Sequence, residues 1–287
     1  MELRCDGKMD CDDLSDEDDC SDIIIFPASY KKHLVPVSNN EDVLLVNVSM
    51  DIQKILEVNE VGQSVKVLFA LTRTWYDSRL THQNINWNTN RNVLSKNSLD
   101  KIWYPSLRFA NIDPTQSNSE TRNTVKVVRN INSKPISADM TNARNSYYFL
   151  GTENMLRKQT LYTYTWTCGF DLTLYPFDTQ LCKMRFDPKE NDLGEVLFRP
   201  VNLQYPVDER HLKEYSIKKL SLCQNPPTGG LVLSITLKRN LTSTILTVYL
   251  PTLLLLCISL VAQVFVPDFL DMVIQVHLTV LLVLASL

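Results

Sequence analysis

The sequence predicts an all-β extracellular sandwich followed by transmembrane α-helices, with a small disulfide- and calcium-type module fragment at the N-terminus. Three observations support this fold class. Apolar and polar residues alternate repeatedly between residues 21 and 240, a long charge-free segment follows, and the cysteine spacing suits disulfides better than zinc. We therefore divide the chain into residues 1–20, 21–240 and 241–287.

Charge and composition restrict the class of protein further. The net charge is only −3 and the basic residues are dispersed, which argues against nucleic-acid binding. Seven cysteines, with sequons for glycosylation at Asn47 and Asn240, favour an oxidising extracellular compartment. We find no catalytic triad, no paired-carboxylate motif and no phosphate-binding glycine loop, so we do not expect an enzyme. The chain starts without a leader peptide and stops within an apolar segment, so we expect a fragment of a longer protein.

Residues 1–20 are dense in carboxylates, which suit Ca²⁺ as oxygen ligands. From Cys5 to Cys20 the pattern Cys-Asp-Gly-x-x-Asp-Cys-x-Asp-x-Ser-Asp-Glu-x-x-Cys resembles the second half of a low-density-lipoprotein-receptor class A module. The resemblance implies a disulfide between these two cysteines. It also implies calcium bound by the side chains of Asp6, Asp10, Asp16 and Glu17 and by the carbonyls of Leu3 and Lys8. An acidic disordered tail is the alternative.

Residues 21–240 have the pattern of a β domain. Period-two alternation predicts strands at 46–52, 65–69, 161–167 and 231–237. A short helix is expected at 30–36, ended by Pro36, and the polar segment 111–124 is expected to be an irregular connection. A two-sheet sandwich fits this pattern.

Cys168 and Cys182 enclose the segment Tyr175-Pro176-Phe177-Asp178. Alternating apolar residues at positions 170, 172 and 174 predict that the first arm is a strand, and Pro176 then turns the chain. A disulfide between the two cysteines would hold this turn as a rigid loop. Two interpretations remain: an ordinary stapled hairpin of a secreted sandwich, or a protruding functional loop.

The last part of the chain is apolar. Residues 241–266 contain no charge, which predicts a first transmembrane helix, a buried core helix being the alternative. Residues 269–287 form a second apolar segment, expected to be a truncated pore helix. One face of it carries Asp271, Gln275, Thr279, Leu282 and Ser286. Such a stripe faces either water or neighbouring helices. The first interpretation makes it a pore wall, in which Leu282 is the hydrophobic constriction.

This order of features resembles the Cys-loop pentameric ligand-gated ion channels. The motif Trp75-x-Asp77-x-Arg79-Leu80 is similar to a strand motif of that family, and Pro251 matches the proline of its first membrane helix. Trp103-Tyr-Pro105 is similar to a turn motif of the same family, Trp-x-Pro followed by an acid, with Ser106 in place of the acid. The resemblance covers about residues 22–287. It implies a subunit of a homo- or hetero-pentamer in the plasma membrane, synaptic membranes included, where a small extracellular ligand bound between subunits opens a pore for permeant ions.

The resemblance also implies that the Cys168–Cys182 loop sits on the membrane helices. We hypothesise that Arg239 forms an electrostatic cluster with Asp178 and Glu60, and we assign Tyr175 and Pro176 to the same coupling region. Three solvated surface charges are the alternative.

Agonist contacts are expected at Arg108, Phe109 and Phe186. Amine-binding members of the family use a box of aromatic side chains. The segments 185–191 and 223–230 lack such a box, so we do not expect a typical acetylcholine-binding subunit. Protons, a metal, an acidic ligand or an accessory subunit without a ligand remain alternatives. A ring of Asp271 carboxylates favours cations, while the inner-mouth residues match neither the cation nor the anion type.

Two further classes are compatible with parts of the sequence. A soluble binding pentamer of the same fold conflicts with the charge-free segment 241–266. An anchored adhesion or uptake receptor, suggested by residues 1–20, predicts one simple anchor helix rather than two apolar segments.

Overall fold

A computed structural model describes residues 12, 22–36, 43–139, 146–189, 192, 194–206, 212, 214–265, 274 and 278. The chain divides into two compact units. The first consists of Met1–Phe170, Leu181–Glu209 and Lys219–Thr236, and the second of Asp171–Gln180, Arg210–Lys218 and Leu237–Leu287. The calcium ligands, the Cys5–Cys20 pair and the five pore-lining residues predicted above lie outside the described residues, so these assignments stay predictions.

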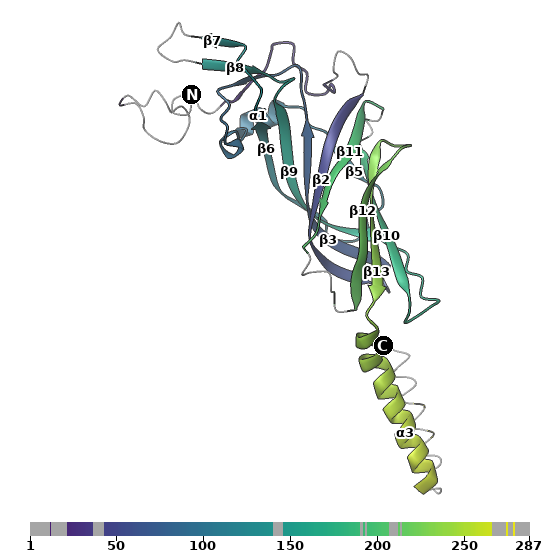
Figure 1. The fold of residues 1–287 in the computed structure, drawn as a ribbon. Coiled ribbons are helices and arrows are strands. Elements are labelled where there is room, and N and C mark those ends of the chain that lie inside the picture. Colours follow the sequence, from purple (N-terminus) through teal and green to yellow (C-terminus); the bar gives the residue numbers. More distant parts are fainter. Residues whose placement is uncertain are drawn as a thin grey trace. The chain divides into compact units, whose positions relative to one another are not determined.

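The largest sheet has the strand order β11-β2-β3-β9-β6, and Figure 1 shows these strands side by side. β11 pairs parallel with β2, and the other neighbours are antiparallel. The strands are β2 (Leu44–Asn59), β3 (Ser64–Trp75), β6 (Ser119–Val128), β9 (Met155–Thr167) and β11 (Val196–Gln204). The strands predicted at 46–52, 65–69 and 161–167 are confirmed within β2, β3 and β9. The prediction of an irregular connection at 111–124 is wrong from Ser119 onwards, because β6 pairs there with the core strand β9.

Two smaller sheets complete the β structure of the described residues. One has the order β12-β13-β10-β5, and the other β1-β4-β8-β7. Their strands are β12 (Tyr215–Asn225), β13 (Gly230–Arg239), β10 (Thr179–Pro188) and β5 (Leu107–Phe109), then β1 (Ile24–Ile25), β4 (Thr81–Gln83), β8 (Ser146–Leu150) and β7 (Ser137–Asp139). The predicted strand 231–237 is confirmed within β13.

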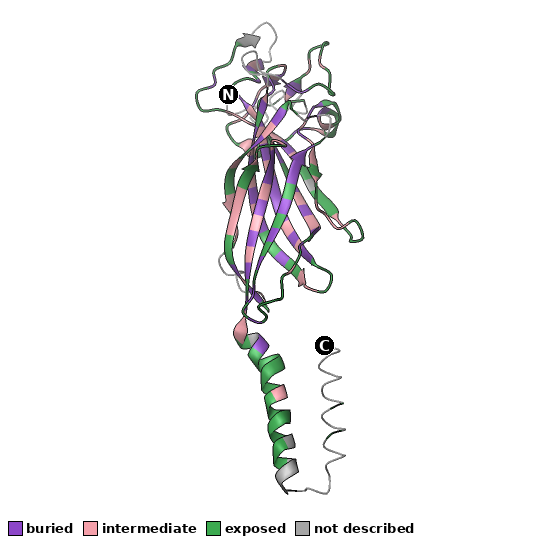
Figure 2. Cartoon of the chain, turned by 90° about the vertical axis from the view of Figure 1, so that its right-hand side faces the viewer, coloured by how far each residue is buried: buried purple, intermediate pink, exposed green. Residues whose placement is uncertain are grey.

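Burial follows the period of two that strands impose. Along β10, four buried residues alternate with exposed ones, and Figure 2 shows the same alternation along other strands. These four are Gln180, Cys182, Met184 and Phe186, after which Asp187 and Pro188 are buried as well. The core of the first unit is aromatic: the Phe69 ring lies 5.4 Å from that of Tyr162, 5.3 Å from Trp166 and 6.0 Å from Phe186. Each such ring buries a large apolar area, and aromatic pairs at these distances add a favourable interaction to that burial.

Arg79 explains both a sequence motif and a wrong prediction. Its Nε and Nη2 atoms each donate to the Asp77 carboxylate at 2.8 Å, and its guanidinium lies 4.5 Å from the Tyr30 ring centroid. Nη1 donates to the carbonyls of Lys31 and Leu34. The segment 30–36 therefore forms turns instead of the expected helix, because a distant arginine binds carbonyls that a helix needs for itself.

The helical residues at the end of the second unit form three consecutive elements. These are α2 (Leu241–Thr244), the π-helix η4 (Ile245–Tyr249) and α3 (Leu250–Phe265). Among the described residues, no helix combines the length and the apolar character required to cross a membrane. Two short helices, η1 (Thr89–Arg91) and α1 (Lys96–Lys101), lie in the first unit.

Candidate functional site

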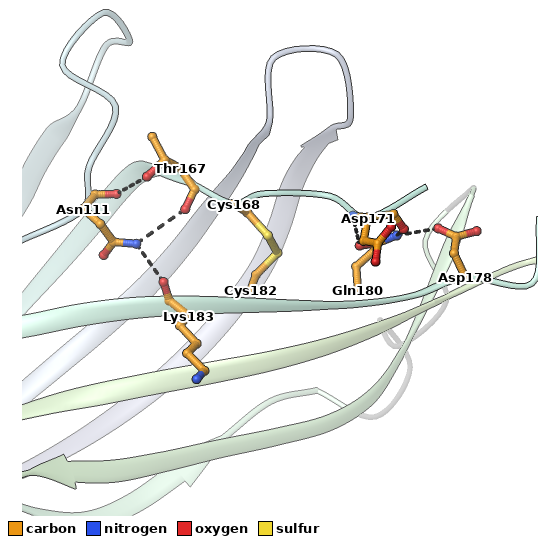
Figure 3. The surroundings of a disulfide bond; sticks show 8 residues. All are labelled: Asn111, Thr167, Cys168, Asp171, Asp178, Gln180, Cys182 and Lys183. Atoms are coloured by element: carbon orange, nitrogen blue, oxygen red, sulfur yellow. Dashed lines mark hydrogen bonds between the residues drawn. A yellow bond between two sulfur atoms is a disulfide. The ribbon is translucent and has the colours of Figure 1, made fainter. Parts of the chain in front are cut away.

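The Cys168–Cys182 disulfide joins the two arms of the loop, with 5.2 Å between the Cα atoms. Figure 3 shows that Asn111 braces the arms on one side of this bond. Its Nδ2 donates to the Lys183 carbonyl at 2.7 Å and to the Thr167 carbonyl at 3.4 Å. The Cys168 N–H donates to the Gln63 carbonyl at 2.7 Å. The base of the loop is thus fixed to the core by polar contacts as well as by the disulfide; the role of Asn111 was not predicted.

Gln180 organises the interior of the loop. Its Nε2 donates to the Asp171 carbonyl at 2.8 Å, and its Oε1 accepts from the Asp171 N–H at 2.9 Å. The Gln180 side chain thus forms hydrogen bonds with both the N–H and the carbonyl of Asp171, the groups that a neighbouring strand would otherwise pair with. The predicted strand in the first arm is therefore wrong: the residues leading to the cis Tyr175–Pro176 bond form turns. Leu174 and Phe177 are 71% and 72% exposed, which agrees with a protruding loop.

A buried ion pair joins this loop to the end of β13. Arg239 continues the inward face of β13 beyond Ile235 and Leu237, so its side chain enters the interior of the second unit. Its Nε lies 2.6 Å from Asp178 Oδ1, and its Nη2 lies 3.0 Å from Oδ2. The two side chains are only 5% and 2% exposed. The pair is therefore bidentate and almost dry, the geometry in which an arginine–carboxylate contact is strongest.

Tyrosine and glutamine side chains complete the cluster. The Tyr215 hydroxyl is hydrogen bonded to Arg239 Nη2 at 2.5 Å, and the rings of Tyr175 and Tyr215 each lie 4.7 Å from the guanidinium. Gln180 Nε2 donates to Asp178 Oδ2 at 2.6 Å. Burial raises the pKa of Asp178, but the hydrogen bonds from Arg239 and Gln180 outweigh it and lower the pKa on balance. The sequence interpretation missed Tyr215, which lies in the strand before β13 and carries no motif.

Asn240 links the cluster to the helix. Its N–H donates to the Glu214 carbonyl at 2.8 Å, and its Nδ2 donates to the Leu212 carbonyl at 3.0 Å. α2 begins at the next residue, Leu241. N-glycosylation replaces one of the two Nδ2 hydrogens and leaves the other for this hydrogen bond, so the glycosylation of Asn240 stays a prediction. Asn47, the other sequon residue, is half-exposed on β2.

Glu60 lies in the turn between β2 and β3, where its carbonyl accepts from the Gln63 N–H at 3.2 Å. It belongs to the first unit, whereas Asp178 and Arg239 belong to the second. The participation of Glu60 in the cluster therefore stays a prediction, as does the coupling role of Tyr175 and Pro176.

The residues predicted to contact an agonist come together on β5 and β10. Arg108 pairs in register with Asp187, and Phe109 pairs with Phe186. Phe186 is only 1% exposed, and the Phe109 ring lies 4.3 Å from that of Tyr164. Phe186 is thus a packing residue of the aromatic core, Phe109 is half-exposed beside it, and Arg108 is exposed, so the agonist contacts stay predictions.

The turn between β12 and β13 lies directly on this region. Thr228 Oγ1 donates to Asp187 Oδ1 at 2.6 Å. A Cβ atom on Gly230 would lie 2.3 Å from the Phe186 carbonyl oxygen and 2.4 Å from Asp187 Oδ1, so only glycine fits there. Backbone and side chain therefore fill the space between this turn and β10.

The described residues thus combine an all-β domain with a disulfide loop and a buried arginine just before a helix. Residues 24–225 match the family model described as the neurotransmitter-gated ion-channel ligand binding domain, and the chain belongs to this family. The family consists of channel domains and not of enzymes, in agreement with the sequence prediction.

Individual relatives are distant. The chain is 25% identical over 231 residues to the serotonin-gated chloride channel mod-1 of Caenorhabditis elegans, which covers 77% of this chain and 42% of that protein. It is 23% identical over 240 residues to the acetylcholine-gated chloride channel subunit acc-1 of the same organism, covering 80% and 46%. It is 22% identical over 222 residues to the gamma-aminobutyric acid receptor subunit theta of Mus musculus, covering 75% and 31%. The chain spans less than half the length of these relatives.

Proposed function

We propose that this chain is the extracellular domain and the first membrane segments of a ligand-gated ion channel subunit. The subunit works in a homo- or hetero-pentamer in the plasma membrane, at synapses or elsewhere. A small ligand bound between subunits shifts the pore from closed to open. The observation that carries the proposal is the buried Asp178–Arg239 pair at the junction of the β domain and the helix.

The ion pair gives the loop a mechanical connection to the helix. Removing one partner of a buried pair typically costs about 3–5 kcal/mol, so the loop and the end of β13 move together rather than separate. Arg239 is separated from α2 by Asn240 alone, whose backbone is held by the Glu214 carbonyl. A displacement of the loop is therefore transmitted to the start of the helix through short, buried contacts.

The helical segment supports a membrane location. α2, η4 and α3 contain 4, 5 and 16 residues and follow one another without a break. At about 1.5 Å per residue, the 16 residues of α3 alone extend roughly 24 Å, short of the ~30 Å hydrocarbon core of a bilayer, and only the three elements together reach that thickness. Figure 2 shows α3 as mostly exposed, and its exposed side chains are large and apolar, a surface that lipid or neighbouring helices would cover. They include Leu253, Leu254, Leu256, Ile258, Leu260 and Val261.

Recordings from the full-length subunit test the proposal. We expect Asp178→Arg to reduce ligand-evoked current at least tenfold per subunit at the cell surface, with the current normalised to surface-labelled protein, because two cations then meet in a buried site. The double variant Asp178→Arg, Arg239→Asp restores the opposite charges and should recover part of the current. Asp171→Arg is the control: it reverses an exposed charge of the same loop and removes only the local hydrogen bonds from Thr173. The coupling proposal fails if Asp178→Arg gates like the wild type.

The ligands to apply follow from the relatives and from the sequence. Serotonin, acetylcholine and gamma-aminobutyric acid are named by the relatives, and pH steps, Zn²⁺ and glutamate represent the proton, metal and acidic alternatives. Reversal potentials under substitution of chloride and of sodium then identify the permeant ion. A subunit that reaches the cell surface with its remaining helices and conducts under none of these ligands, alone or co-expressed, would contradict the channel function.

An accessory subunit is the second candidate. Phe186 is packed in the core, and the Thr228–Asp187 hydrogen bond holds the β12–β13 turn against β10. These features support a subunit that assembles without contributing an aromatic site for an amine. In that case the subunit alone gives no current with the three amine ligands. Co-expression with a channel-forming relative should instead change the current or its ligand sensitivity, and co-purification should show the mixed pentamer.

A further inference from the structure

A pocket opens in the first unit where β2 begins and β3 ends. It has a volume of about 340 Å³, within the usual range for small-molecule sites. Val43, Leu45 and Met155 supply apolar walls, and Asn47, Thr74 and Arg199 supply polar groups. All these residues belong to the first unit, so the pocket is separate from the Asp178–Arg239 cluster of the second.

The strand register explains why the polar groups meet. Arg199 on β11 pairs with Asn47 on β2, and Asn47 pairs with Thr74 on β3. Neighbouring strands lie about 4.8 Å apart, so the three side chains form one short row on the same face of the sheet. The row continues through Arg157 on β9 to Lys126 on β6.

This row carries positive charge without a matching carboxylate. Arg199 is exposed and has no hydrogen bond or ion pair with any described residue. Two carboxylates belong to the same face, Asp51 four residues from Asn47 along β2 and Glu195 four residues before Arg199, each about 14 Å away at about 3.4 Å per residue. The guanidinium of Arg199 is therefore available to an anion from outside the chain, in a planar geometry that suits a carboxylate.

We propose that this pocket binds a small organic carboxylate. The carboxylate pairs with Arg199, the amide of Asn47 and the hydroxyl of Thr74 orient it, and its apolar part packs against Leu45 and Met155. Charge alone would attract any anion, but the apolar walls select one with a hydrocarbon body. The proposal goes beyond channel activity and does not depend on it, because it concerns binding to the first unit alone.

Benzoate and benzamide form a matched pair of probes, since they share shape and differ in charge. Titration calorimetry on the full chain in detergent should show saturable binding of benzoate and at least tenfold weaker binding of benzamide. Arg199→Gln should weaken benzoate at least tenfold. Arg185→Gln removes a comparable exposed arginine on β10 and should leave the affinity within twofold. Equal binding of the two probes, no effect of Arg199→Gln, or no saturable binding overturns the proposal, and none of these results bears on gating.

A glycan on Asn47 is the competing occupant, because this residue belongs to a sequon and lines the pocket. Protein from a glycosylating host is therefore compared with the Ser49→Ala variant, which lacks the sequon. Benzoate binding by both forms supports a ligand site in the native protein. Binding by Ser49→Ala alone assigns the pocket to the glycan and overturns the proposal.

Discussion

Arg239 and Arg73 are both buried, yet the two units provide them with opposite electrostatic surroundings. Arg239 has a bidentate carboxylate partner in Asp178. Arg73 donates to the Pro105 carbonyl at 2.7 Å and to the hydroxyls of Thr160 and Tyr162, and its Nε has no partner in the described structure. No carboxylate of the described residues forms an ion pair with Arg73.

A second cation adds to the charge at Arg73. Lys158 lies directly opposite it on β9, with its Nζ 3.5 Å from the Tyr104 ring centroid. Burial, followed by the charge of Arg73, lowers the pKa of Lys158 to about 8. Burial likewise lowers the pKa of Arg73. Ser106 stands where the resembling turn motif carries an acid, so this turn supplies no counter-charge.

The two arginines have different structural roles. Arg73 and Lys158 hold the Trp103–Pro105 turn through a carbonyl and an aromatic ring, contacts that fix a static part of the core. Arg239 instead connects two segments far apart in sequence through a contact that depends on charge. Glu120 acts on both cations electrostatically but forms no ion pair with either, so we infer that burial of the two cations reduces the stability of the first unit, whereas the paired arginine stabilises the second.

The largest effect is expected when the paired arginine loses its carboxylate. Asp178→Ala leaves Arg239 buried without its counter-charge, and we expect the free energy of unfolding to fall by about 3–5 kcal/mol. Guanidinium-chloride unfolding measures it, and Asp171→Asn, an exposed change in the same loop, should stay within about 0.5 kcal/mol. If Asp178→Ala lowered the free energy of unfolding by less than about 1 kcal/mol, Arg239 would not depend on its carboxylate partner, and the proposed difference from Arg73 would be wrong.

The pH dependence of stability, compared between the wild type and Asp178→Ala, tests the direction of the Asp178 pKa shift. The pKa of Asp178 is lowered in the folded protein. Its contribution to stability is therefore present above the unfolded value of about 3.9 and is lost as the pH falls through the folded value. Asp178→Ala should lack this acid-dependent loss.

A smaller and opposite effect is expected at Lys158. Its folded pKa of about 8 lies below the unfolded value of about 10.4, so the charged form is disfavoured by folding. The destabilisation is full below pH 8 and is relieved as the pH rises towards 10.4. Raising the pH from 7 to 9.5 should stabilise the wild type by about 2 kcal/mol relative to Lys158→Met. Parallel pH profiles of the two proteins would contradict a buried, charged lysine.

Much of this comparison follows from strand periodicity. Arg73 is in phase with Val67, Phe69 and Leu71, and Arg239 is in phase with Ile235 and Leu237, so alternation alone places both side chains inward. The hypothesis of an Asp178–Arg239 contact came from the family resemblance, since nothing in the spacing of residues 178 and 239 brings them together.

Other features depend on partners distant in sequence. The turns at 30–36 require Arg79, and the irregular first arm of the disulfide loop requires Gln180. Local propensity favoured a helix in the first case and a strand in the second, and in both a side chain from elsewhere bound the backbone groups first. The burial of Phe186 was readable from the alternation along β10, but its aromatic character suggested a ligand contact instead.

The smallest effects on stability are expected at Tyr215, where two variants distinguish the contribution of the hydroxyl from that of the ring. Tyr215→Phe removes the hydrogen bond to Arg239 and keeps the ring 4.7 Å from the guanidinium, so we expect a loss of about 1 kcal/mol. Tyr215→Leu also removes the ring and should cost about 1 kcal/mol more. Unfolding of both variants, in the wild-type and the Asp178→Ala backgrounds, measures the coupling between hydroxyl and carboxylate. If Tyr215→Phe destabilised the protein as much as Asp178→Ala, hydroxyls would hold Arg239 as they hold Arg73, and the difference between the two arginines would disappear.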